Sequence, residues 1–267
     1  MSSRRRILLG AATLVIVVTV VAALFSSRES ATPTSLVQQD QLGPVLLVSG
    51  YGGGTAAVDD LAAALRAGGR DATVIPVVGD GTGDLREQAQ SLRTAADAAL
   101  ASGAPSVDVV GFSAGGVVVS VWAEEFGGAF VARRIVTLGA PHHGSELAAI
   151  GGTLTPEQCP EGCRQLAPGS ALLLGLDEAT PGPRWTTVSS ADDQVVTPES
   201  AQLEGAVNVS LQDVCPDAFV EHDDLPRAPV VRGIVALALD VIPLDASPDT
   251  SSCADITAAG HLGAAAR

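Results

Sequence analysis

Short runs of aliphatic and β-branched residues alternate along the chain with longer segments in which apolar residues recur at helical spacing. Such alternation is typical of a largely parallel sheet flanked by helices, so the pattern predicts the α/β class. Strands are expected at residues 44–49, 72–78, 106–111, 134–138, 185–189 and 207–211. Helices are expected after Gly54 to about Ala67, from the N-cap candidate Asp84 to about Leu100, directly after Ser113, and from Pro226 through about Val241.

This alternation breaks between residues 144 and 182. Glycines, prolines and two cysteines surround a single short apolar run there, Leu172 to Leu176. We expect the segment to be an insertion, a cap or lid, and not part of the core. Sheet order resumes after it, and residues 42–267 have a length that suits one α/β domain.

The N-terminal residues have the pattern of an export signal. Arg4 to Arg6 precede an uncharged and mostly apolar stretch from Ile7 to Phe25. A helix of that length is roughly 28 Å long, close to the hydrocarbon thickness of a membrane, whereas the apolar part of a cleaved signal is usually shorter. The sequence therefore predicts a signal peptide or, in preference, an uncleaved signal anchor at 1–25, and a tether at 26–41. The domain would then lie outside the cytoplasm, anchored in the cell membrane or secreted.

The charge of the chain excludes one class of partner. The formal net charge is −15, and all 15 basic residues are arginine. An acidic surface repels phosphate backbones, so nucleic acid is not expected as a partner. Because 46% of its residues are hydrophobic, the chain can form a globular core. We expect this globular domain to be a monomer.

Four cysteines agree with an oxidising compartment and two disulfides, for which three connectivities are possible. We favour Cys159 with Cys163, which would close a small loop in the inserted segment. The second pair would be Cys215 with Cys253, which would attach the C-terminal tail to the loop that carries Cys215. Free thiols are one alternative. A zinc site of four thiolates is another, but it is disfavoured because no Cys-x-x-Cys pair is present.

Ser113 is the candidate nucleophile. It is the centre of Gly111-Phe-Ser-Ala-Gly115, between a predicted, largely apolar strand and a predicted amphipathic helix. Glycines on both sides allow the strained strand-to-helix turn that raises a serine hydroxyl above a sheet in the α/β-hydrolase fold. The motif alone is weak because the chain contains 29 glycines, but the strand before it and the helix after it are the context that the chemistry requires.

A second glycine-rich turn, Gly50 to Gly54, follows the first predicted strand. Its amides can face the oxyanion that forms when a serine attacks a carbonyl group. We therefore assign the oxyanion hole to the backbone N–H groups of Tyr51 and Ala114, the residue after the nucleophile. A phosphate-binding loop is the other interpretation of these glycines, but the chain has neither a Walker lysine nor a spaced dinucleotide fingerprint here.

A serine nucleophile needs a general base, and the chain contains four histidines. In the α/β-hydrolase fold the histidine follows both nucleophile and acid, which disfavours His142 and His143; we expect these two to form a turn after a strand. His222 lies between the last predicted strand and the last predicted helix, where a loop can bring it over Ser113. His261 is near the C-terminus with no helix after it, so His222 is preferred.

The acid is expected in the turn Ser189-Ser-Ala-Asp-Asp-Gln-Val-Val-Thr-Pro198, which follows a predicted strand and precedes His222. Asp192 and Asp193 both fit this role. Either carboxylate could accept the imidazole N–H and stabilise the imidazolium, so their chemistry alone does not separate them.

These motifs together resemble those of the small bacterial lipases and esterases of the α/β-hydrolase superfamily, over residues 43–240. The shared features are the glycine-rich loop, Gly-x-Ser-x-Gly, a turn like Leu138 to Gly144, and an acid turn of the form Asp-x-Ile/Val-Val-x-Pro. Asp193 to Pro198 fits the last pattern, so the resemblance selects Asp193 over Asp192. The family usually has His-Gly where this chain has Ser49-Gly50, so the support of the oxyanion loop is expected to differ.

The residues and the resemblance predict an exported or membrane-anchored hydrolase of carboxylic esters, acylglycerols among them, with no organic cofactor and no metal. Ser113, His222 and Asp193 would pass the acyl group to water through an acyl-enzyme. One alternative is an acyltransferase that uses the same three residues and passes the acyl group to an envelope alcohol. Another is an inactive hydrolase-like module that binds a lipid or an envelope partner.

Overall fold

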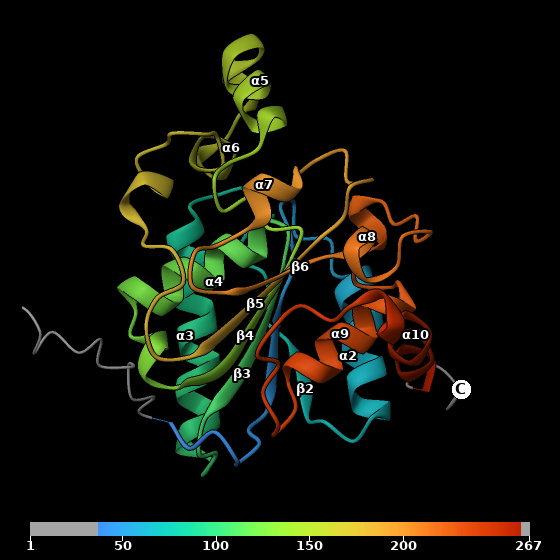
Figure 1. The fold of residues 1–267 in the computed structure, drawn as a ribbon. Coiled ribbons are helices and arrows are strands. Elements are labelled where there is room, and N and C mark those ends of the chain that lie inside the picture. Colours follow the sequence, from blue (N-terminus) through green and yellow to red (C-terminus); the bar gives the residue numbers. More distant parts are fainter. Residues whose placement is uncertain (1–36, 263–267) are drawn as a thin grey trace, which may run out of the picture. The chain divides into compact units, whose positions relative to one another are not determined.

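The computed structural model describes residues 37–262, which belong to one compact unit (Figure 1). The predicted signal anchor at 1–25 and most of the predicted tether lie outside the described residues. Val37 is buried, however, and the carbonyl group of Gln39 accepts a hydrogen bond from Arg133. Two residues at the end of the predicted tether, Val37 and Gln39, are therefore packed against the domain.

Within residues 37–262, six parallel strands form one sheet in the order β2-β1-β3-β4-β5-β6. The strands are β1 (Val45–Val48), β2 (Ala72–Val74), β3 (Val107–Phe112), β4 (Ala132–Leu138), β5 (Arg184–Ser189) and β6 (Val207–Ser210). The predicted α/β class and parallel sheet are confirmed. Strand β2 is shorter than expected: the Ile75 amide still bonds to the Leu47 carbonyl, but Pro76 has no N–H to continue the ladder.

Helices cover both faces of this sheet (Figure 1). They are α2 (Ala56–Ala67), α3 (Leu85–Ala101), α4 (Ala114–Glu125), α5 (Glu146–Leu154), α6 (Glu161–Gln165), α7 (Pro198–Ala201), α8 (Leu211–Val214), α9 (Pro229–Ala238) and α10 (Cys253–Leu262). Short 3₁₀ turns are η1 (Gly128–Phe130), η2 (Pro156–Gln158), η3 (Leu173–Gly175), η4 (His222–Asp224) and η5 (Thr250–Ser252). No helix in the described part of the chain is long and apolar enough to span a bilayer.

Two predictions about the helices were wrong. The helix expected from Pro226 begins at Pro229, where a proline tolerates the first helical position, and a further helix, α10, follows it. The helix after Ser113, expected to be amphipathic, is buried on all sides from Ala114 to Ala123. Helix α4 is thus a core helix between the sheet and its neighbours.

The strands supply two core clusters because successive side chains point to opposite faces of the sheet. In β1, Val45 and Leu47 join the cluster formed with α2, α9 and α10, whereas Leu46 and Val48 join the cluster formed with α3 and α4. Both faces are therefore covered by helices, as in parallel sheets generally. The loops after the carboxyl ends of the strands remain available for a site.

The inserted segment, 144–182, is only partly outside the core. Helix α5 has no buried residue and projects from the body (Figure 1), whereas Leu166, Leu172 and Leu173 are buried in the core cluster with α3 and α4. Gln165 caps α3 by accepting from the Leu85 amide (2.8 Å) and donating to Asp84 (2.7 Å). The expectation that the whole segment lies outside the core is therefore wrong for its second half.

Two disulfides connect Cys159 with Cys163 and Cys215 with Cys253, as the sequence predicted. The first bridges η2 and α6 within the inserted segment. The second links the end of α8 to the start of α10, so it attaches the C-terminal helix to the loop that leads to His222.

A buried charge cluster joins β3 and β4 at their amino ends. The strand register shifts there, since Val107 pairs with Ala132 but Asp108 pairs with Arg134, which leaves Arg133 as the extra residue of a β-bulge. Arg133 donates to both carboxylate oxygens of Asp108 (3.0 and 2.6 Å), and neither side chain is exposed. Arg70 adds a third hydrogen bond to the same carboxylate (2.6 Å).

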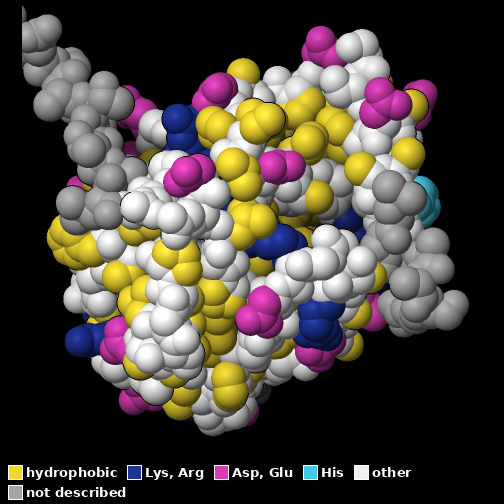
Figure 2. Space-filling view, turned by 90° about the horizontal axis from the view of Figure 1, so that it is seen from below, with side chains coloured by type: hydrophobic (Ala, Val, Ile, Leu, Met, Phe, Trp, Pro, Cys, Tyr) yellow, Lys and Arg dark blue, Asp and Glu magenta, His cyan; other side chains and the backbone are white. Residues whose placement is uncertain are grey.

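Arg133 also binds the carbonyl groups of Gln39, Leu239 and Asp240. The cluster thus ties the segment before β1 and the segment after α9 to the amino edge of the sheet. Figure 2 views the molecule from the side of this edge, where arginine side chains reach the surface between apolar ones.

Asp108→Ala should lower the free energy of unfolding by about 3–5 kcal/mol, because it leaves the Arg133 guanidinium buried without its counter-charge. Urea denaturation of the purified domain measures this loss. Asp97→Ala, which removes the exposed partner of Arg93, is the matched control and should change stability by less than about 1 kcal/mol. Equal losses in the two variants would contradict a special role for the buried cluster.

Candidate active site

Ser113 occupies a strained turn between β3 and α4. Its φ of 54° and ψ of −129° make it the only non-glycine residue with a positive φ in the described part of the chain. Such a conformation costs on the order of 1–3 kcal/mol, so the surrounding structure must enforce it. Two backbone hydrogen bonds do so, from the Ser113 amide to the Leu138 carbonyl and from the Gly116 amide to the Ser113 carbonyl, each 2.9 Å long.

Glycines after the serine bring α4 against the sheet. A Cβ atom at Gly115 would lie 2.4 Å from the Val48 carbonyl oxygen, and one at Gly116 would lie 2.3 Å from the Ala140 Cβ atom. Both distances are too short for any side chain. The second glycine of the Gly-x-Ser-x-Gly motif, and the glycine after it, are thus required by helix-to-strand packing as well as by the turn.

The structure brings His222 between Ser113 and Asp193, residues that are far apart in the sequence. The His222 Nε2 atom lies 2.8 Å from Ser113 Oγ, and Nδ1 lies 2.6 Å from Asp193 Oδ2. Both His222 and Asp193 are buried, and the Phe112 ring packs beside the imidazole with its centroid 5.1 Å away. Three of the predicted site residues therefore form one continuous hydrogen-bonded chain.

The two candidate acids point in different directions. Asp193 uses Oδ2 for His222 and Oδ1 for the backbone amides of Val195 and Val196, at 2.8 Å each. Asp192 instead accepts from the side chain of Gln212 (3.0 Å) and from the Val220 amide (3.4 Å). Asp193 is thus the carboxylate beside the imidazole, and Asp192 lies in a separate network.

Gly139, at the end of β4, makes room for this pair and was not singled out from the sequence. A Cβ atom there would lie 3.0 Å from Asp193 Oδ2 and 3.3 Å from His222 Cε1. The signal that could have identified it is its place after a strand that neighbours the serine strand, since the carboxyl ends of parallel strands meet at one edge.

The other histidines do not approach Ser113 by any contact in the structure. His142 is buried, with its ring nitrogens 3.4 Å from Ser120 Oγ and 3.1 Å from Thr137 Oγ1. Burial, followed by the effect of nearby His143, lowers the pKa of His142 to about 3, so its ring is neutral near pH 7. Both His142 and His143 lie in a turn after β4, as expected, and His261 lies in α10.

The glycine-rich turn after β1 lies directly against the serine. A Cβ atom at Gly50 would be 3.1 Å from Ser113 Cβ, so the Gly50–Tyr51 peptide borders the hydroxyl. Ala114 is the first residue of α4, where an amide has no acceptor within the helix. The turn also brings Tyr51 close to Asp80; partial burial and that carboxylate raise the pKa of the phenol.

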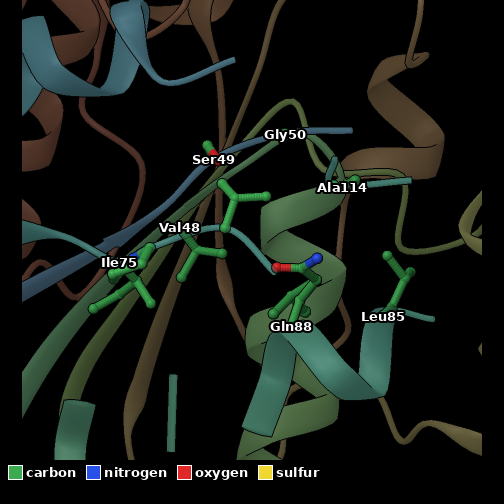
Figure 3. Close-up of a pocket in the computed structure, with 11 residues that line it drawn as sticks. Val48, Ser49, Gly50, Ile75, Leu85, Gln88 and Ala114 are labelled. Carbon is green, nitrogen blue, oxygen red and sulfur yellow. The ribbon is translucent and has the colours of Figure 1, made fainter. Parts of the chain in front are cut away.

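A cavity of about 20 Å³ lies beneath this turn, lined among others by Ser49, Gly50, Gln88 and Ala114 (Figure 3). The volume is sufficient for about one water molecule. Gln88, in α3, holds the loop of residues 78–81, which borders the glycine-rich turn. Its side-chain amide bonds to both the N–H and the carbonyl of Val78 (2.9 and 2.8 Å). Gln88 is therefore a support of the glycine-rich turn that sequence reasoning missed.

The Gly81 carbonyl, in the same loop, accepts a hydrogen bond from the Gly52 amide (3.1 Å). Support for the glycine-rich turn thus comes from residues 78–81 and from α3, beside Ser49. In the described part of the chain, no group of three His, Cys, Asp or Glu side chains could hold a metal ion.

No model of a known protein family matches the chain, and no curated protein matches its sequence. Solved structures do match. The lipase BlEst2 of Bacillus licheniformis in its propeptide form gives a TM-score of 0.64 at 20% identity, covering 77% of this chain and 52% of that one. Its mature form gives 0.60 at 18% identity, covering 74% and 92%. Lipase B of Aspergillus fumigatus gives 0.62 at 18% identity, covering 83% and 61%.

The chain thus spans about half the length of the propeptide form and less than two thirds of the A. fumigatus lipase. At these identities the similarity shows the fold. The chain has the α/β-hydrolase fold that its sequence predicted, with helices on both faces of a parallel sheet.

Acidification should destabilise the fold through His142. An unfolded histidine takes up a proton below its usual pKa of 6.5, whereas burial keeps folded His142 neutral down to about pH 3. Between these values the unfolded state binds more protons, so the free energy of unfolding falls as the pH falls. From pH 7 to pH 5 the contribution of His142 to this loss should be about 2 kcal/mol.

Urea denaturation at both pH values, on the wild type and on His142→Gln, measures this contribution as a difference in pH dependence. Gln202→Ala, which replaces an exposed residue that does not titrate, is the control and should keep the dependence of the wild type. The expectation fails if His142→Gln loses as much stability on acidification as the wild type does.

Proposed function

We propose that the protein is a serine hydrolase of carboxylic esters. The observation that carries the proposal is the hydrogen-bonded chain from Asp193 through His222 to Ser113, with the serine on a strained strand-to-helix turn. Nucleophile, acid and base follow one another in the sequence in the order typical of α/β-hydrolases. The structural similarity to two lipases supports the same class of reaction.

In the proposed reaction, His222 Nε2 takes the proton of Ser113 Oγ as the hydroxyl attacks the ester carbonyl carbon. The amides of Tyr51 and Ala114 stabilise the negative oxygen of the tetrahedral intermediate. Asp193 orients the imidazole and stabilises its charged form, which then protonates the leaving alcohol. Water, activated by the same histidine, hydrolyses the acyl-enzyme and restores the serine.

Lipid esters are the proposed substrates, and helix α5 supports this choice. Leu147, Ile150 and Leu154 are 53%, 50% and 75% exposed, and their spacing of three and four residues places them on one side of the helix. The segment is attached to the acid turn, because Ser145 Oγ donates to the Val195 carbonyl (2.8 Å). An apolar stripe next to the acid turn suits aggregated acylglycerols better than small soluble esters.

We also propose that the domain works outside the cytoplasm, anchored in the cell membrane or secreted. Its two disulfides support this location, since such bonds persist in oxidising compartments. The basic and then apolar pattern of residues 4–25 supports an export signal or a membrane anchor.

Ser113→Ala should abolish ester turnover and labelling by a fluorophosphonate probe, because no other residue then supplies the activated hydroxyl. Peptide mapping of the labelled wild type should place the adduct on Ser113. An adduct on another residue, or no labelling while a control serine hydrolase is labelled, would overturn the proposal. Free acid as the product both with and without added glycerol supports hydrolysis, whereas a glycerol ester would indicate acyl transfer.

Asp193→Asn should lower kcat by about 10⁴-fold, because the amide cannot hold the imidazole in the reactive tautomer. Asp192→Asn keeps an oxygen acceptor for Gln212 and Val220 and should retain most of the activity. Steady-state kinetics on p-nitrophenyl acetate compare the two variants. If Asp192→Asn suffered the larger loss, Asp192 and not Asp193 would be the acid of the triad.

The triple variant Leu147→Ser, Ile150→Ser, Leu154→Ser should reduce the rate on emulsified tributyrin and leave the rate on p-nitrophenyl acetate within about twofold, because none of these side chains is buried. Leu174→Ser, an exposed leucine of η3 outside this stripe, is the matched control. Equal rates for wild type and triple variant on both substrates would exclude α5 from substrate binding.

A further inference from the structure

The turn that carries Asp193 and the loop that carries His222 are joined by side-chain hydrogen bonds. Ser190 Oγ donates to the Val220 carbonyl (2.7 Å), and the Val220 amide donates to Asp192 Oδ2 (3.4 Å). Val220 is two residues before His222 and is itself buried. The backbone that delivers the imidazole is thus bonded on both its N–H and its C=O to the acid turn.

Gln212, in the short helix α8, lies at the centre of this network. Its Oε1 atom accepts from the Ala191 amide (2.9 Å). Its Nε2 atom lies within hydrogen-bond distance of Asp192 Oδ2 (3.0 Å), the Ala218 carbonyl (3.1 Å) and Ser190 Oγ (3.3 Å). The side-chain amide of Gln212 therefore bonds to the acid turn through both its oxygen and its nitrogen. Its nitrogen also bonds to the loop of residues 216–221 that precedes His222, which we call the histidine loop.

The histidine loop has few other fixed points. Cys215, at its start, is held by the disulfide to Cys253, and His222 begins the 3₁₀ turn η4, whose next residue, Leu225, is buried. Between these points, residues 216–221 belong to no helix or strand. Apart from a turn bond from the Ala218 amide to the Cys215 carbonyl and the packing of Val220 in the core, this stretch is held by the bond of Ala218 to Gln212 and the bonds of Val220 to the acid turn.

We propose that Gln212 is a positioning residue for the triad: with Asp192 and Ser190, it sets the His222 loop against the Asp193 turn so that the imidazole meets both Asp193 and Ser113. The inference rests on the proposed ester-hydrolase function. The side chain of Gln212 bonds to residues 190–192 and to Ala218, and not to Ser113, His222 or Asp193. Its effect follows from geometry, since displacement of a catalytic group by about 1 Å can cost roughly 100-fold in rate.

The test is a reversal of one hydrogen bond. Gln212→Glu keeps the size of the side chain and its acceptor for the Ala191 amide, but it loses the donor and places a carboxylate against Asp192. We expect kcat on p-nitrophenyl acetate to fall by roughly 10- to 100-fold with KM within about twofold. In the double variant Gln212→Glu, Asp192→Asn, the amide at position 192 can donate to the carboxylate at position 212 and two carboxylates no longer face each other. The Val220 amide then loses its acceptor, so kcat should recover in part.

Gln202→Ala, at an exposed position, is the matched control and should behave as the wild type. Thermal unfolding of each variant separates positioning from a general loss of stability. The proposal is overturned if folded Gln212→Glu keeps kcat within twofold of the wild type. It is also overturned if the double variant is no more active than the single one, because the hydrogen bond would then have no part in the effect.

A second measurement does not depend on turnover. The short hydrogen bond between His222 Nδ1 and Asp193 should give a strongly downfield proton resonance in the NMR spectrum, absent in His222→Ala. Gln212→Glu should move this resonance upfield or broaden it by faster exchange with water. An unchanged resonance would contradict positioning by Gln212, whereas an inactive wild type with the expected shift would contradict only the ester-hydrolase function.

Discussion

The main-chain conformation of Ser113 is the constraint on which the rest of the site depends. The chain passes from strand to helix at this one residue, so α4 must begin against the ends of β1 and β4. That close approach requires glycine at positions 115 and 116, and it buries α4 on all sides. The hydroxyl, the first amide of α4 and the glycine-rich turn after β1 are brought together as consequences of one tight turn.

Much of this arrangement could be predicted from the sequence because it depends on local patterns. Runs of β-branched residues identified the strands, and chain order selected His222 among four histidines. Resemblance to a family, and not chemistry, favoured Asp193. Of the two aspartates, Asp193 is the one whose carboxylate lies within hydrogen-bond distance of the imidazole ring. The disulfide pairing was also predictable. Cys159 and Cys163 are close in the sequence and close a small loop, whereas Cys215 and Cys253 join the loop before His222 to the chain after α9.

What could not be predicted depends on contacts between distant parts of the chain. An aspartate within an apolar strand gives no sign that an arginine 25 positions later, displaced by a bulge, will neutralise it. Helix α10 has three alanines and one glycine among its ten residues, and it has no apolar stripe to reveal it. The support of the glycine-rich turn by Gln88 and the network around Gln212 likewise join segments whose spacing in the sequence carries no pattern.

The position of the Arg133 cluster determines at which edge of the sheet the described part of the chain begins. Arg133 holds Gln39 at the amino edge of the sheet, while Ser113 follows the carboxyl end of β3, a strand of six residues. Those two edges are roughly 20 Å apart. A bead or fusion partner joined directly to Val37, with residues 1–36 removed, would therefore meet the domain at the edge opposite the serine, and immobilisation there would leave the hydroxyl facing the solution.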